Sequence, residues 1–147
     1  MSQISFRTGS ISLRAASSLS AIAVSRSSSY DRWDGALSSL ADVPFITMGE
    51  GTSLCRLTRD LCREAGFTPR IAVQSDDPYY VRKCVELGLG VALVPLFSWQ
   101  GQFGDGVALH PLPQQRDTWL YTAPDRYLPL CARRFCDLLM EVCRTGE

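Results

Sequence analysis

The sequence has neither the charge excess nor the histidines on which many nucleic-acid-binding and catalytic proteins depend. Fifteen Lys and Arg residues balance fifteen Asp and Glu residues, so no global positive field attracts a phosphate backbone. No run of about 18 apolar residues is present, which excludes a membrane-spanning helix. The single histidine, His110, has no predictable acid or nucleophile beside it. Direct DNA binding, a membrane span and a His-based catalytic site are therefore disfavoured.

The cysteines do not form the pattern of a disulfide scaffold or a zinc site. Two cysteine pairs lie seven residues apart within helical patterns, namely Cys55 with Cys62 and Cys136 with Cys143. Seven residues rise by about 10 Å along a helix, which is too far for a disulfide bond. Short Cys/His pairs are absent. We expect all six cysteines, Cys84 and Cys131 included, to be buried free thiols in a cytoplasmic protein without metal or cofactor.

The first 30 residues differ in composition from the rest of the chain. They contain eleven serines, three arginines and no acid, and only Ala21 to Ser25 has the pattern of a strand. We therefore predict an irregular, disordered leader over residues 1–20 and a folded domain over residues 21–147. Three origins of the leader stay open: an organellar transit peptide, a weak signal peptide, or a remnant of a longer gene.

From residue 37 onward, short apolar strands alternate with amphipathic helices. Ser38 or Ser39 is expected to cap one helical turn before the first strand. Strands are predicted over residues 44–48, 70–74 and 91–95, and helices over residues 53–65 and 78–87. Such alternation predicts an α/β fold with a mainly parallel sheet and helices on both faces.

An aromatic, glycine-rich loop follows this unit over residues 97–106. Its Phe97, Trp99 and Phe103 are expected either to line a cleft or to form an exposed apolar patch. Two strand candidates, over residues 107–112 and 118–123, and an amphipathic helix over residues 130–144 complete the chain.

Three sequence blocks, LADVPFI, LCREAGFTPRI and SDDPYYVRKCVELGLGVALVP, resemble the effector-binding domain of LysR-type transcriptional regulators. The resemblance covers about 125 residues and implies a lobe like that of a type 2 periplasmic binding protein. The matching residues correspond to the second lobe of the family's effector-binding domain, together with the C-terminal strands and helix that pack on the first lobe in that family. The family's helix-turn-helix, its dimerising linker helix and its first lobe have no counterpart here. The resemblance therefore implies a fragment that contacts DNA only through the missing helix-turn-helix, from a family that forms homo-oligomers.

The loop after the first predicted strand is the main candidate for ligand contact. Met48, Gly49, Glu50, Thr52 and Ser53 place glycine, hydroxyls and free N–H groups at a helix N-terminus, which suits an anionic small molecule. The resemblance also implies effector contacts in this loop. Thr52 or Ser53 would, however, serve as an N-cap in any protein.

A second group of candidates follows the next strand. Ser75, Asp76 and Asp77 lie where ligands collect in open α/β sheets, although helix capping explains them equally well. Pro95, at the end of the third predicted strand, completes the predicted effector site. Tyr79 and Tyr80 are expected either in a cleft wall or in the core.

The sequence thus favours a non-enzymatic domain that binds a small-molecule effector. One alternative is a lobe of a periplasmic solute-binding transport protein; another is a small α/β enzyme that uses Asp76 or Asp77 as its acid or base. Gly88 and Gly90 end a helix instead of opening one, which argues against a dinucleotide site.

Overall fold

The computed structural model describes residues 4–7, 10–31, 33–123 and 126–145. The chain divides into two compact units, one formed by Leu19–Gln114 and the other by the residues before and after that segment. The boundaries fall within two long strands, β2 (Ser10–Ser25) and β6 (Val107–Thr122). The candidate site lies entirely in the unit Leu19–Gln114.

The strands of this unit pair in both directions. β3 (Pro44–Met48) runs parallel to β4 (Arg70–Ser75), and a parallel bridge joins Phe45 to Val91, just before β5 (Ala92–Pro95). β5 pairs antiparallel with β2, and β6 also pairs with β2. The predicted α/β class is confirmed, and the parallel pairings found among the described residues join β3 to β4 and Phe45 to Val91.

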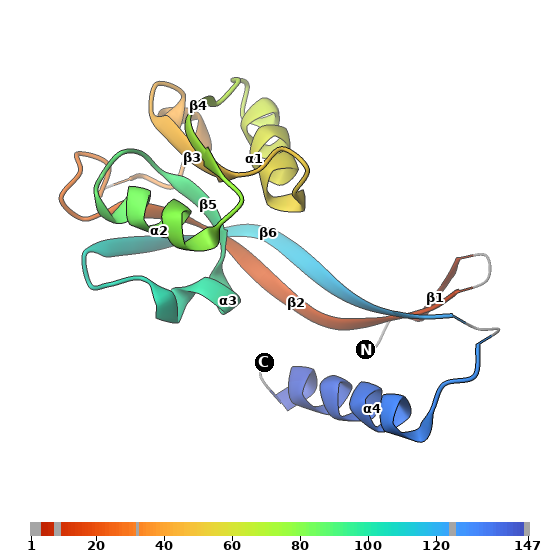
Figure 1. Ribbon diagram of the computed structural model, residues 1–147. Coiled ribbons are helices and arrows are strands. Elements are labelled where there is room, and N and C mark those ends of the chain that lie inside the picture. The colour runs from red at the N-terminus through yellow and green to blue at the C-terminus, as the bar shows by residue number, and fades with distance from the viewer. Residues whose placement is uncertain (1–3, 8–9, 32, 124–125, 146–147) are drawn as a thin grey trace. The chain divides into compact units, whose positions relative to one another are not determined.

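Two helices connect the parallel strands. α1 (Ser53–Glu64) follows β3 and α2 (Pro78–Glu86) follows β4, and both contact β3 (Figure 1). Phe45 of β3 lies beside Leu61 and Cys62 of α1 in one apolar cluster, so Phe45 points to the α1 face. Successive strand residues point to opposite faces, so Ile46 points to the other. The two faces of β3 are thereby buried separately.

The core of this unit comes from the apolar runs noted in the sequence. Phe45 has no exposed surface and its ring centroid lies 6.1 Å from that of Phe67. Val81 and Val85 of α2 are buried as well. Removing such side chains from water stabilises the fold by about 1.5–3 kcal/mol each. Strands β2 and β5 add further buried apolar residues to this core: Ala21, Ile22, Ala23, Val24, Ala92, Leu93 and Val94.

Most predicted element bounds agree with the structure to within a residue or two, and strands also occur within residues 1–20, where the sequence shows no period. Strand β1 (Ile4–Arg7) pairs antiparallel with the beginning of β2, with Ile4 opposite Leu13. Pairing of this kind is made by backbone groups, so it does not need the apolar period that was sought in the sequence. The division of the chain into a leader and a domain stays a prediction.

Three expectations need correction. The helical turn η1 (Leu37–Leu40) has Ala36 at its N-cap, without a side-chain bond, and neither Ser38 nor Ser39 caps it. The aromatic loop contains helix α3 (Leu96–Trp99) and the turn η2 (Gln100–Gln102). The two final strand candidates form one continuous strand, β6.

The aromatic residues of this loop pack inward where they are described. Trp99 is only 8% exposed, and its ring lies 6.3 Å from Phe103 and 5.4 Å from the Arg82 guanidinium. The expected exposed patch is therefore absent at Trp99 and Phe103. The Phe97 side chain lies outside the described residues.

The C-terminal helix, α4 (Leu130–Thr145), exposes the stripe that the sequence predicts to be apolar. Phe135 and Val142 are 61% and 59% exposed, and Leu130 and Leu138 are exposed too. In the part of the chain that is described, no helix combines the length and the apolar character that a membrane crossing requires.

The five cysteines whose side chains are described are free, but they are not uniformly buried. Cys55 and Cys62 are buried, Cys84 and Cys136 are half-buried, and Cys131 is exposed. The expectation of burial is wrong for Cys131 because it belongs to the exposed helix α4. Burial raises the pKa of the Cys62 thiol to about 11.

The raised pKa of Cys62 predicts a loss of stability in alkali. The pKa of the Cys62 thiol is higher in the folded chain than in the unfolded chain. The contribution of this thiol to the free energy of unfolding is therefore complete below the unfolded pKa and is lost as the pH rises toward 11. We expect the free energy of unfolding to fall by about 1–2 kcal/mol more between pH 8.5 and 11 in the wild type than in Cys62→Ala. Urea denaturation at several pH values measures this difference. Equal slopes against pH in the two proteins would contradict it.

Candidate functional site

A short loop after β3 leads into α1 and is held by one hydroxyl. Thr52 is the N-cap: its Oγ1 donates to the Gly49 carbonyl at 2.8 Å and accepts from the Cys55 N–H at 3.2 Å. The Thr52 N–H also donates to the Gly49 carbonyl, at 3.0 Å. The capping explanation is therefore correct for Thr52. Ser53 is the first residue of α1.

The loop after β4 is closed in a similar way. Asp77 is the N-cap of α2, and its Oδ1 accepts from the Tyr79 N–H at 2.8 Å. The Ser75 hydroxyl accepts from the Asp77 N–H at 3.2 Å. Asp77 and Ser75 thus have structural partners, whereas Asp76 lies between them with an exposed side chain.

The two loops border one open cavity of about 400 Å³. Its lining is Gly49, Glu50, Gly51, Gln74, Ser75 and Asp76. The predicted juxtaposition of the two loops follows from the parallel pairing of β3 and β4, with Met48 opposite Ser75. Sequence reasoning missed Gln74, whose amide donates to the Met48 carbonyl at 3.3 Å, because nothing distinguished it from other strand residues.

Gly49 lies against the Asp76 side chain of the other loop. A Cβ at this position would lie 1.8 Å from the Asp76 Oδ1. Any side chain at position 49 would therefore displace the Asp76 carboxylate from the cavity wall.

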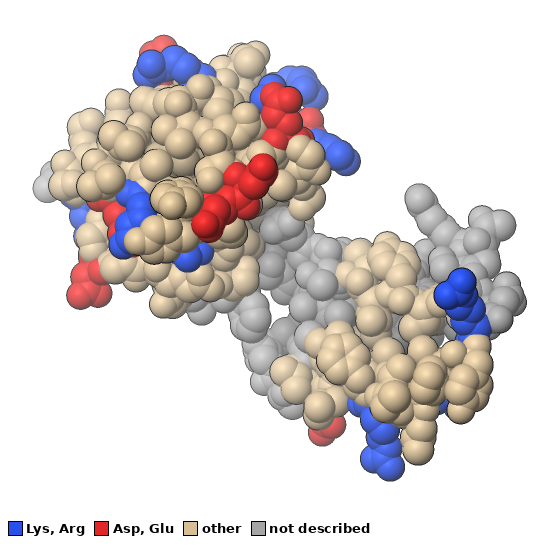
Figure 2. Space-filling view, viewed as in Figure 1, with Lys and Arg blue, Asp and Glu red and all other residues tan. Residues whose placement is uncertain are grey.

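The charges around the cavity are mainly acidic. Glu50 forms an exposed ion pair with Arg59 at 3.2 Å, which offsets its charge only weakly. Figure 2 shows acidic side chains on the surface near the start of α2, where Asp76 and Asp77 lie. Because like charges repel, the side of the cavity formed by Asp76 disfavours an anion.

A second crevice is expected between the carboxyl ends of β3 and β5. β4 lies on one side of β3 and β5 on the other, so the strand order reverses between β3 and β5. Such a reversal is the usual ligand position in open α/β sheets. Pro95, buried at the end of β5, lies opposite Ser20 of β2, but it does not line the cavity between the two loops.

Two polar side chains at this end of the sheet were missed by the sequence reasoning. Ser20 is 0% exposed and Thr47 is 3% exposed, and among the described residues neither hydroxyl has a hydrogen-bond partner. An unpaired buried hydroxyl costs about 1–3 kcal/mol, which makes such groups candidates for ligand contact. The sequence did contain a signal for these two residues, because each hydroxyl adjoins or lies within an apolar strand segment. Ser20 directly precedes AIAV, and Thr47 lies within PFITM.

Other residues singled out in the sequence lie outside this site. Tyr79 and Tyr80 are 51% and 59% exposed and stack edge to face with each other, so they line neither the core nor the cavity. The His110 Nε2 has no hydrogen-bond partner among the described residues. Within the described ranges, no group of three or more potential metal-ligating side chains gathers.

The capping role of Asp77 makes a prediction. Asp77→Ala should lower the free energy of unfolding by about 1 kcal/mol because the Tyr79 N–H loses its acceptor. The neighbouring Asp76→Ala, which removes no cap, should change it by less than about 0.5 kcal/mol. Urea denaturation followed by circular dichroism compares the two variants. The reverse order of stabilities would contradict the assignment of the cap.

Comparison with known proteins gives consistent results. The model of the LysR substrate binding domain matches residues 22–144. The HTH-type transcriptional regulator ShiR of Corynebacterium glutamicum (strain R) is 45% identical over 56 residues, covering 37% of this chain and 19% of that protein. The uncharacterized HTH-type transcriptional regulator YcgK of Bacillus subtilis (strain 168) is 30% identical over 103 residues, covering 68% of this chain and 31% of that protein. The chain thus matches less than a third of the length of either relative.

Solved structures share the fold at low sequence identity. The effector binding domain of QuiR in complex with shikimate has a TM-score of 0.79 at 16% identity, covering 98% of this chain and 70% of that one. The regulatory domain of CcmR from Synechocystis PCC6803, in complex with 2-PG, has a TM-score of 0.79 at 14% identity, with coverage of 97% and 71%. Together with the family match over residues 22–144, these findings show that the chain belongs to the LysR substrate-binding domain family of transcriptional regulators.

Proposed function

We propose that this chain forms one wall of an effector site in a LysR-type transcriptional regulator, with the ligand over the carboxyl ends of β3 and β5. The observation that carries this proposal is the pair of buried, unpartnered hydroxyls of Ser20 and Thr47 near the point where the strand order reverses. The predicted contacts from Met48, Gly49, Glu50, Thr52, Ser53, Ser75, Asp76, Asp77 and Pro95 surround the same end of the sheet.

The effector is a small polar molecule whose carboxylate or other anionic group faces α1 and not Asp76. The positive end of the α1 dipole favours negative charge, whereas Asp76 repels it. A small hydroxy acid fits both conditions because its hydroxyls can pair with Ser20 and Thr47. Shikimate and 2-PG, the ligands of the QuiR and CcmR domains, are therefore suitable probes.

The chain binds this effector without converting it, and binding shifts the geometry of attached DNA-binding domains. DNA contact then requires a helix-turn-helix, because these residues carry no charge excess. We place the protein in the cytoplasm as a homo-oligomer, as is expected for this family. The comparisons favour neither a transport lobe nor an α/β enzyme.

Calorimetric titration with shikimate and with 2-PG tests the placement of the ligand. Thr47→Val and Ser20→Ala remove the hydroxyls with little change of shape, so each should weaken binding by about tenfold. Neither should lower the thermal unfolding midpoint, because the lost hydroxyls are unpaired in the free chain. The matched control, Thr68→Val, alters an exposed threonine after α1 and should leave binding unchanged.

Three results would count against the proposal. Unchanged affinity in both Thr47→Val and Ser20→Ala would contradict contact with these hydroxyls. Failure of the wild type to bind either probe at millimolar concentration would contradict the small hydroxy-acid class. Chemical turnover of a bound probe, followed by NMR, would contradict a non-enzymatic role.

A further inference from the structure

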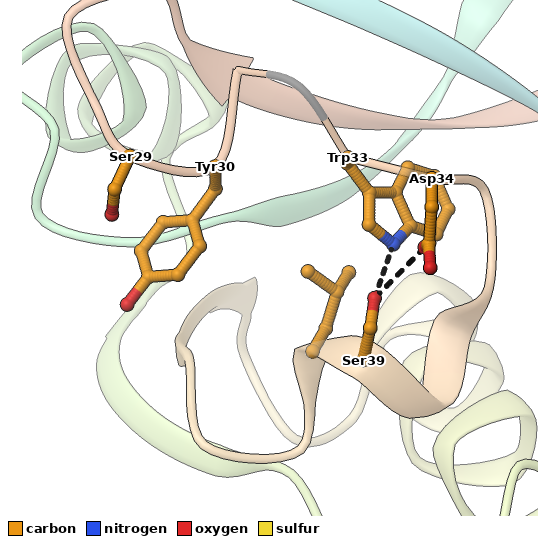
Figure 3. Close-up of a pocket in the computed structure, with 6 residues that line it drawn as sticks. Ser29, Tyr30, Trp33, Asp34 and Ser39 are labelled. Atoms are coloured by element: carbon orange, nitrogen blue, oxygen red, sulfur yellow. Dashed lines mark hydrogen bonds between the residues drawn. The ribbon is translucent and has the colours of Figure 1, made fainter.

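A second hollow lies among the residues that precede β3. Its volume is about 260 Å³, and Figure 3 shows Tyr30 on one side of it and Trp33 on the other. The complete lining is Ser29, Tyr30, Trp33, Asp34, Ser39 and Leu40. This lining includes neither Ser20 nor Thr47 and shares no residue with the cavity between the loops after β3 and β4, so the hollow is distinct from the proposed effector site.

Trp33 is held in place as a wall of this hollow. Its Nε1–H donates to the Ala36 carbonyl at 2.9 Å and to the Ser39 hydroxyl at 3.0 Å. The Trp33 ring also meets the His110 ring at 89°, with centroids 5.6 Å apart. These contacts fix the indole before any ligand arrives, so little side-chain freedom remains to be lost on binding.

Asp34 supplies a negative charge beside the indole. Its Oδ1 accepts from the Ala36 N–H at 2.9 Å and from the Ser39 hydroxyl at 3.1 Å, which orients the carboxylate. The ion pairs recorded among the described residues join other side chains and leave out Asp34. Figure 3 shows the Trp33 indole, the Ser39 hydroxyl and the Asp34 carboxylate linked in one network.

We propose that this hollow binds a small organic cation, such as an alkylammonium compound. Aromatic faces attract cations through the electrostatic field of the ring, and a fixed carboxylate adds direct attraction. Asp34 repels an anion, and it is the charged side chain among the described residues that border the hollow. The geometry gives the domain a second ligand site, formed by residues that precede β3.

Tetramethylammonium is the probe that tests this proposal, because it carries charge without a hydrogen-bond donor. In an NMR saturation-transfer experiment, the protein protons are saturated and the signal of the tetramethylammonium methyl protons is followed as its concentration rises. The whole chain is used, and the ionic strength is held constant. We expect saturable binding that weakens at least about fivefold in Asp34→Asn and in Tyr30→Leu. Trp33→Leu should weaken it further. Tyr79→Leu, which removes an exposed tyrosine elsewhere, serves as the matched control and should bind as the wild type does.

Asp34→Asn retains an oxygen that can accept from Ala36 and Ser39, so it separates the charge from the structure of the turn. Thermal unfolding shows whether each variant is folded; should Trp33→Leu not fold, Asp34→Asn and Tyr30→Leu still decide the outcome. Non-saturable binding, equal binding by wild type and Asp34→Asn, or tighter binding of neutral methyl glucoside than of tetramethylammonium would overturn the proposal.

Discussion

Replacing Gly90 with alanine is expected to destabilise the domain by about 3 kcal/mol. A Cβ at this position would lie 2.3 Å from the Pro44 carbonyl oxygen and 3.0 Å from its carbon. Both atoms belong to backbone and cannot rotate away. The added methyl group must therefore push β3 from β5 at the point where the Val91 N–H donates to the Pro44 carbonyl at 2.9 Å.

Urea denaturation of Gly90→Ala and of a second glycine variant measures this effect. Gly101→Ala is the matched control because an added methyl group there would have no atom within 4 Å and the φ of Gly101 is not positive. We expect the control to change the free energy of unfolding by less than about 0.5 kcal/mol. Equal midpoints for the two variants would contradict the close contact between Gly90 and β3.

Phe45→Ala is expected to have the other large effect, a loss of about 3–5 kcal/mol. Phe45 has no exposed surface and packs near Phe67 and beside Leu61 of α1. Truncation would leave a cavity there, and the parallel pairing of β3 with β4 limits how far the strand can move to fill it.

Phe135→Ala provides the comparison for Phe45→Ala. Phe135 lies on α4 and is 61% exposed, so its truncation should cost less than about 0.5 kcal/mol. Thermal and urea unfolding of both variants separate a core phenylalanine from a surface one. A cost for Phe135→Ala close to that for Phe45→Ala would show that the apolar stripe of α4 is covered within this chain.

These two phenylalanines show how far sequence patterns reach. Both occur in apolar patterns, and the patterns correctly predicted β3 and α4 themselves. Whether the apolar stripe is buried depends on what packs against it, which periodicity alone does not specify. The same limit explains Cys131, which was expected to be buried and is exposed on α4.

The sequence predicts which loops follow β3 and β4, but not the polar groups around them; the effector contacts of these loops stay a prediction. Parallel strands end at the same edge of a sheet, so the meeting of Gly49 with Asp76 follows from strand order. The apolar strands around Ser20 and Thr47 indicate that both hydroxyls are buried, but whether a buried hydroxyl has a partner depends on neighbours distant in sequence. The strands before Ala21 were missed because their composition is polar and lacks a clear period.

The double hydrogen bond of the Thr52 hydroxyl has a consequence for the thermodynamics of ligand recognition. By joining the Gly49 carbonyl to the Cys55 N–H, it restrains the turn between β3 and α1 in the free chain. Ordering a flexible backbone costs about 1–2 kcal/mol per residue in lost conformational entropy, and a turn that is already restrained avoids much of that cost. At the proposed effector site, affinity would therefore depend less on folding the loop around the effector than on matching the effector to a surface already in place.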